Sequence, residues 1–177
     1  RAAGLNLKAA ADKAGKPIYL EMSSVNPIFV LPGALRERSA GVANELYNSC
    51  SLGAGQFCTN PGLTILLDNA EGRAFLNEVK ALFEAKPPQI LLGASGVQSI
   101  AEGIAVLVTH GAEVVTGGHE VVGGGFCFEN TLLKVSSDVF LRNPHPLQTE
   151  AFGTVNLMVF ARNVKEMVDI TAQLEGN

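Results

Sequence analysis

Cys58 lies in the segment GAGQFCTNPG, residues 53–62, where its thiol could act as a nucleophile. The glycines around it allow the backbone to approach a ligand closely. A cysteine attacks as the thiolate, so it must be accessible and partly deprotonated to react. The alternative is a small apolar residue that fills the core, which is common for a lone cysteine. The segment alone leaves these two interpretations about equal.

Glu21 is the first of two glutamates that could assist such a thiol. It follows the apolar run IYL, residues 18–20, which predicts a short strand. We therefore expect Glu21 at the carboxyl end of a strand, where α/β folds bind ligands. A carboxylate is costly there unless it is paired or works as a base. The alternative is a carboxylate that caps local backbone N–H groups.

Glu150 is the second glutamate, and it directly precedes Ala151, Phe152 and Gly153. A carboxylate beside an aromatic ring in a loop could hold a ribose hydroxyl while the ring packs on a cofactor. A solvated loop glutamate would have the same local sequence. This pattern alone is therefore weak.

The histidines His110, His119 and His145 could in principle pair with Cys58, as in a cysteine hydrolase. None of them lies in a pattern that requires this pairing. His110 is expected at the C-terminus of a helix, where the helix dipole favours a cation, and this simpler interpretation is preferred.

The elements that must position these residues alternate between strands and helices. Apolar runs predict strands at residues 18–20, 28–31, 63–67, 114–115, 132–135 and 155–160. Helical spacing predicts helices at residues 1–15, about 34–50, 75–83, 97–108 and 164–174. Cys50 lies on the apolar stripe of the second helix, so we place it in the core. The glycines between residues 117 and 125 predict a loop or a hairpin. The alternation predicts an α/β fold with a largely parallel sheet.

Composition restricts the classes of function. The chain has 177 residues, of which 47% are hydrophobic and 17% charged, which is typical of one packed domain. A net charge of −4 argues against nucleic acid as a partner. No run approaches the ~18 apolar residues that a membrane span needs, and no secretory leader is recognised. We therefore expect a cytoplasmic protein with no membrane partner.

The three cysteines include no CxxC pair, so neither a disulfide framework nor a zinc site is predicted, and we expect no metal. No GxGxxG follows a strand and no P-loop is present. If a dinucleotide is bound, we expect its main binding domain to lie outside these residues.

Three segments, taken together, resemble the aldehyde dehydrogenase family. They are EMSSVNP at residues 21–27, GQFC at 55–58 and TEAFG at 149–153, in the family's order and at suitable intervals. The resemblance implies a three-layer αβα domain in which Cys58 is the nucleophile and Glu21 the general base. It also implies that Glu150 binds the nicotinamide ribose, that Phe152 packs near the nicotinamide, and that the cofactor is NADP or NAD.

Two departures from the family pattern point to one branch. Met22-Ser23-Ser24 stands where Leu-Gly-Gly is usual, and Gly153-Thr154 where Gly-Pro is usual. Both resemble the branch that oxidises α-ketoglutaric semialdehyde (2,5-dioxopentanoate), which is also similar to bacterial NADP-dependent fatty aldehyde dehydrogenases. Asn26 resembles a structural asparagine of the family. Residues 1–4, RAAG, resemble the end of its cofactor loop.

The resemblance implies that residues 1–177 are the thiol-bearing catalytic domain, separated from its cofactor-binding domain. It implies a homo-oligomeric enzyme that oxidises a small aldehyde to an acid through a thiohemiacetal and a thioester on Cys58. Three alternatives remain: a dehydrogenase that transfers the acyl group to coenzyme A, a cysteine hydrolase or thioesterase, and a non-enzymatic interaction module. Glu21 argues against the first. The second requires a histidine within ~3 Å of the sulfur, and the third a buried Cys58.

Overall fold

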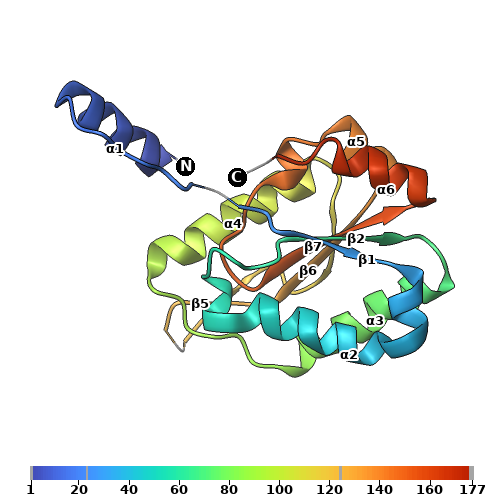
Figure 1. Ribbon diagram of the computed structural model, residues 1–177. Helices are drawn as coiled ribbons and strands as arrows, with labels where there is room; N and C mark the ends of the chain where they lie inside the picture. The colour runs from blue at the N-terminus through green and yellow to red at the C-terminus, as the bar shows by residue number, and fades with distance from the viewer. Residues whose placement is uncertain (1, 23, 124, 176–177) are drawn as a thin grey trace.

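The computed structural model describes residues 2–22, 24–123 and 125–175, and a five-stranded sheet lies at its centre (Figure 1). The strands, in spatial order, are β1 (Pro27–Val30), β2 (Leu63–Leu67), β7 (Val155–Ala161), β6 (Thr131–Ser136) and β3 (Glu113–Thr116). The first four run parallel, and β3 is antiparallel at one edge. The predicted α/β fold with a largely parallel sheet is confirmed.

Helices cover both faces of this sheet, which gives three layers (Figure 1). One face carries α2 (Pro32–Ser51) and α3 (Ala70–Ala85), and the other carries α4 (Ala94–Thr109), α5 (Ser137–Arg142) and α6 (Val164–Thr171). Crossover connections through these helices are what a parallel sheet requires. The predicted helices are therefore present, together with the short α5, which was not predicted.

The central strand β7 packs into two hydrophobic clusters, one on each face of the sheet. All of its residues are buried. Leu157 and Val159 belong to the cluster under α4, α5 and α6, whereas Met158 and Phe160 belong to the cluster under α2 and α3. This division follows from the alternation of side chains along a strand. Each large apolar side chain that is fully buried contributes about 1.5–3 kcal/mol to folding.

Two local predictions within the core had different outcomes. Cys50, at the end of α2, has no exposed surface, which confirms its place in the core. Val108, which the spacing of residues 97–108 assigned to the buried stripe of α4, is 43% exposed. Leu107 is buried instead, because it lies three residues after Ile104 and seven after Ile100, on the same face of the helix.

The predicted strand at residues 18–20 is wrong. α1 (Ala2–Lys13) stands off from the sheet, and residues 14–22 and 24–26, which link it to β1, form no strand (Figure 1). Tyr19 is 95% exposed. An apolar triplet forms a strand only if a neighbouring strand supplies hydrogen bonds, and this segment has no such neighbour among the described residues.

The glycines between residues 117 and 125 lie in and beside a small hairpin, as predicted. Its strands are β4 (Glu120–Val121) and β5 (Cys127–Phe128), which pair in the antiparallel direction. Gly123 and Gly125 both have a positive φ, and Gly124 lies outside the described residues. No helix in the described ranges is long and apolar enough to cross a membrane.

Candidate active site

The segments that carry the candidate residues all lie at the amino ends of strands. The segment with Glu21 leads into β1, the loop with Cys58 leads into β2, and the loop with Glu150 leads into β7. Because β1, β2 and β7 are parallel neighbours, these three approaches meet at one edge of the sheet. The expectation that Glu21 lies at the carboxyl end of a strand is therefore wrong. The site lies at the opposite edge from the one that open α/β sheets usually use.

The loop that carries Cys58 has a strained backbone and an exposed thiol. After α2 the chain enters the 3-10 turn η1 (Leu52–Gly55), in which Gly53, Ala54 and Gly55 have φ values of 58°, 59° and 71°. The left-handed conformation of Ala54 costs about 1–2 kcal/mol. Cys58 is exposed, and its backbone N–H has no hydrogen-bond partner within the described residues. Cys58 is thus not a core residue.

Two glutamine side chains, one of them within the loop, fix the position of the same loop by hydrogen bonds. The Gln89 side chain accepts a hydrogen bond from the Ala54 N–H at 3.1 Å and donates one to the Ser51 carbonyl at 2.9 Å. The Gln56 side-chain oxygen accepts a hydrogen bond from the Leu92 N–H at 2.9 Å. These bonds offset part of the strain and fix the turn that precedes the thiol.

Asn26 joins the Glu21 segment to the cysteine loop. Its side-chain amide donates to the Cys58 carbonyl at 2.6 Å and to the Asn60 carbonyl at 3.0 Å. Its own φ is 46°, a conformation that asparagine tolerates better than most residues. The Gly62 N–H also donates to the Val25 carbonyl at 2.8 Å. These contacts support the structural role that the resemblance implied for Asn26.

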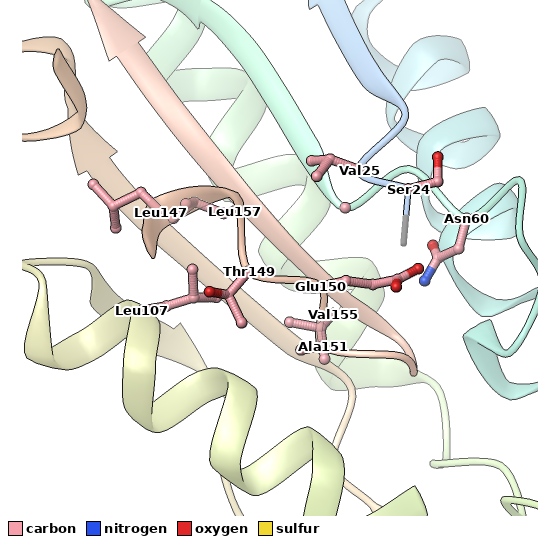
Figure 2. Close-up of a pocket in the computed structure, with 11 residues that line it drawn as sticks. Ser24, Val25, Asn60, Leu107, Leu147, Thr149, Glu150, Ala151, Val155 and Leu157 are labelled. Carbon is pink, nitrogen blue, oxygen red and sulfur yellow. The ribbon is translucent and has the colours of Figure 1, made fainter. Parts of the chain in front are cut away.

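Glu150 borders a small cavity between these segments. Figure 2 shows its side chain extending toward Asn60 and the main chain at Ser24. The cavity has a volume of about 20 Å³, room for about one water. Burial raises the pKa of Glu150, and a hydrogen bond from the Ser24 backbone opposes this effect only in part. Phe152 lies half-buried in the same loop.

Glu21 itself lies exposed on the segment between α1 and β1. Within the described residues it has no hydrogen bond or ion pair. The burial that a strand at residues 18–20 would have given it is not present. Of the motif around it, Ser23 lies outside the described residues, as does Arg1 of the N-terminal segment that resembles a cofactor loop.

No hydrogen bond joins any of the histidines to Cys58 within the described residues. His110 Nδ1 lies 2.8 Å from the Val106 carbonyl of its own helix, and His145 lies 3.2 Å from Glu175. His119 lies beside the Gly117 carbonyl in the hairpin region. The arrangement that a cysteine–histidine hydrolase needs is therefore not seen in this part of the chain.

Asn60 is a site residue that the sequence did not reveal. Its side-chain amide donates to the Gly55 carbonyl at 3.0 Å and to the Gly153 carbonyl at 2.7 Å. It thereby links the cysteine loop to the loop that contains Glu150. The available signal was its position just after Cys58 and before a proline, which is typical of many loops.

Comparison with known proteins gives a consistent result. The model of the aldehyde dehydrogenase family matches residues 1–175. Alpha-ketoglutaric semialdehyde dehydrogenase 2 of Azospirillum brasilense is 30% identical over 160 residues, 90% of this chain and 30% of that protein. The alpha-ketoglutaric semialdehyde dehydrogenase of Acinetobacter baylyi matches with the same identity and coverage. The chain therefore spans about 30% of the length of these curated relatives.

The fold is also similar to that of solved structures. Betaine aldehyde dehydrogenase of Staphylococcus aureus, in complex with NAD+, superposes with a TM-score of 0.72 and 16% identity. The match covers 97% of this chain and 40% of that one. At this identity the similarity concerns the fold alone.

Proposed function

The chain belongs to the aldehyde dehydrogenase family, and on this basis we propose that it carries the thiol of an enzyme that oxidises an aldehyde to a carboxylic acid with NAD+ or NADP+. The resemblance of the three sequence segments to this family is thus confirmed. The observation that carries the proposal is the convergence of these segments at the amino edge of the sheet. There an exposed thiol lies in a loop that is bonded both to the Glu21 segment and to the Glu150 loop.

Cys58 has the properties that the first step requires. Its exposed thiol would release a proton to solvent, and the thiolate sulfur would form a bond to the carbonyl carbon of the aldehyde. The carbonyl oxygen then becomes an oxyanion, which needs a hydrogen-bond donor. The backbone N–H of Cys58 is a candidate, because it has no partner within the described residues. Removing one such donor typically costs ~10²–10³ in rate.

Glu150 and Phe152 would hold the nicotinamide cofactor. The Glu150 carboxylate fits this role, because it accepts hydrogen bonds and its burial is only partly compensated by the Ser24 backbone. Hydroxyl groups of a ribose would supply the missing donors. When bound, the cofactor would supply the acceptor for the hydride that leaves the carbon attached to Cys58.

Glu21 would act in the release of the acid. It would take a proton from a water molecule while the water oxygen bonds to the acyl carbon, and the Cys58 sulfur would leave as a thiolate. Glu21 precedes Asn26 on a segment that is fastened to the Cys58 loop. This attachment supports a location near the thiol.

We propose α-ketoglutaric semialdehyde as the substrate and 2-oxoglutarate as the product. The two curated relatives at 30% identity both carry this activity in their names. The departures at residues 22–24 and at Thr154 agree with that branch. A comparison of kcat/KM for this semialdehyde with that for a long-chain aldehyde tests the assignment, and a preference for the long chain would reassign the substrate.

The variant Glu21→Gln tests the roles of the two catalytic residues in the complete enzyme. We expect a burst of NAD(P)H of about one per active site, since the thioester still forms, followed by a steady state slowed ~10²–10⁴-fold. Cys58→Ser is the matched control and should abolish the burst. Loss of the burst in Glu21→Gln would instead assign Glu21 to the activation of Cys58. An unchanged steady state would make Glu21 structural.

A further inference from the structure

We propose that Asn60 is a positioning residue that sets the placement of the Cys58 thiol relative to the Glu150 loop. This inference rests on the proposed function and extends it to a residue outside the family's three segments. Asn60 touches neither the thiol nor the Glu150 carboxylate through any hydrogen bond in the described chain. It acts through the main chain of both loops.

The partners of the Asn60 side chain determine which way its amide group is oriented. Its nitrogen has two hydrogens, and both are donated, one to the Gly55 carbonyl at 3.0 Å and one to the Gly153 carbonyl at 2.7 Å. Carbonyl oxygens only accept hydrogen bonds, so the opposite orientation of the amide would place three acceptors together. One side chain therefore bridges the two loops.

The two glycines that Asn60 bridges are themselves in direct backbone contact. A Cβ on Gly55 would overlap the main chain of Gly153, and the φ of Gly55 is 71°. A Cβ on Gly153 would in turn overlap the side chain of Ile100 in α4. The loops thus meet at Gly55, where only glycine fits, and the Asn60 amide donates to the carbonyls of both Gly55 and Gly153.

Asn60 also receives a bond from the third segment. The Asn26 amide donates to the Asn60 and Cys58 carbonyls. A chain of two amides therefore runs from the Glu21 segment, through the main chain around Cys58, to the Glu150 loop. Asn60 is the residue that makes the last link, to the loop that contains Glu150.

The bridge is made at a cost to stability. The Asn60 side-chain oxygen is buried and has no hydrogen-bond partner in the described chain. An unpaired buried acceptor is unfavourable. A side chain that served only the stability of the loop would gain from a paired oxygen, whereas a residue that must bridge two carbonyls can tolerate this loss.

Asn60→Asp is the sharpest variant, because it keeps the shape and replaces the donor with an oxygen that faces two carbonyls. Asn60→Ala removes the donor without adding charge, in case the aspartate prevents folding. Asn44→Asp is the matched control, since Asn44 lies exposed on α2 and donates one bond, to the Ala40 carbonyl.

Hydrogen exchange tests the Asn60 bridge between the two loops, and this measurement does not require the chain to be enzymatically active. Both Asn60 variants lose two hydrogen bonds. We therefore expect amide exchange at the hydrogen-bonded N–H groups of Gln56, Asn60 and Gly153 to rise at least roughly tenfold, with β2 and β7 unchanged. In the wild type, the side-chain hydrogens of Asn60 should exchange more slowly than those of Asn44. Equal side-chain exchange, or loops that do not respond, would overturn the proposal.

Kinetics of the complete enzyme distinguish a positioning role of Asn60 from a role in the stability of the loop alone. We expect Asn60→Ala to raise the KM for NAD(P)+ roughly tenfold, with the burst amplitude and the KM for aldehyde unchanged. A fall in burst amplitude alone would indicate a structural role and reject positioning. If the wild-type enzyme oxidises no aldehyde while both loops still respond in exchange, the proposed function fails and the bridge between the loops stands.

Discussion

The pKa of a glutamate is shifted in opposite directions at the two edges of the parallel sheet. At the carboxyl edge, Glu166 in the first turn of α6 is buried and accepts hydrogen bonds from the Ser137 hydroxyl and from the backbone and guanidinium of Arg162. These bonds lower its pKa, the Ser137 bond most. At the amino edge, burial raises the pKa of Glu150. The hydrogen bond from the Ser24 backbone lowers it, but by less than burial raises it.

The larger of the two cavities at these edges does not lie at the proposed site. A cleft of about 370 Å³ lies at the carboxyl edge, far larger than the cavity beside Glu150. Its charged groups are paired with one another, Asp68 with Arg73 and Glu113 with Lys134. At the amino edge, an exposed thiol, an incompletely compensated carboxylate and an unpaired amide oxygen lie together. Incomplete pairing, rather than volume, marks the site that can gain from a ligand.

The largest expected difference is in the rates at which two cysteines near the amino edge are alkylated. Burial raises the pKa of the Cys50 thiol, so Cys50 stays protonated and enclosed. Cys58 is exposed. Iodoacetamide should therefore modify Cys58 at least ~10³ times faster than Cys50, because Cys50 reacts only when the domain opens. Peptide mapping by mass spectrometry measures both rates.

Cys127, which is also buried, serves as the internal control for this labelling. It should follow Cys50 rather than Cys58, and all three should react alike in urea. Modification of Cys50 before Cys58 in the native protein would remove the contrast on which the nucleophile assignment depends.

The sequence predicted the parts of the fold that depend on local patterns. The largely apolar run at residues 63–67 became β2, and the helical stripe through Cys50 became the buried face of α2. In both cases the packing neighbours are supplied by the bulk of the core, so periodicity alone suffices. The family resemblance predicted Cys58 and Glu150 as site residues from residue types and order, and these two assignments stay predictions.

The errors concern contacts between distant segments. The run at residues 18–20 has the composition of a strand but no strand beside it, so it stays irregular and leaves Glu21 exposed. The edge at which the site lies depends on strand order and direction, which no single segment encodes. Asn60 acquires its role only when Gly55 and Gly153, far apart in the sequence, come into contact.

The next contrast concerns the glycine contact between the loops. Gly55→Ala would place a Cβ against the Gly153 backbone and force a left-handed conformation on alanine. We expect a loss of about 1–3 kcal/mol in the free energy of unfolding. Gly33→Ala is the control, since Gly33 in α2 has open space around it and no positive φ. It should be neutral or stabilise by about 0.4–1 kcal/mol. Urea unfolding measures both, and equal effects would show that the loops do not meet as described.

The smallest expected effect comes from the two carboxylates themselves. The pKa of Glu166 is lowered in the folded state, so its contribution to stability is present above its unfolded pKa and is lost as the pH falls through its folded pKa. Glu166→Gln should therefore lower the free energy of unfolding by about 1 kcal/mol at neutral pH, with the loss shrinking below about pH 4.

For Glu150 the sign is reversed. Its folded pKa is raised, so its favourable contribution is present below its unfolded pKa and disappears as the pH rises through the folded pKa. At neutral pH, where ionised Glu150 is only partly compensated, Glu150→Gln should leave stability unchanged or raise it slightly. Urea unfolding of both variants between about pH 3 and pH 7 measures the two slopes. The opposite slopes are the test, because a Glu150 that served only to stabilise the fold would lose stability on amidation as Glu166 does. A parallel loss in both variants would mean that the amino edge is as fully paired as the carboxyl edge.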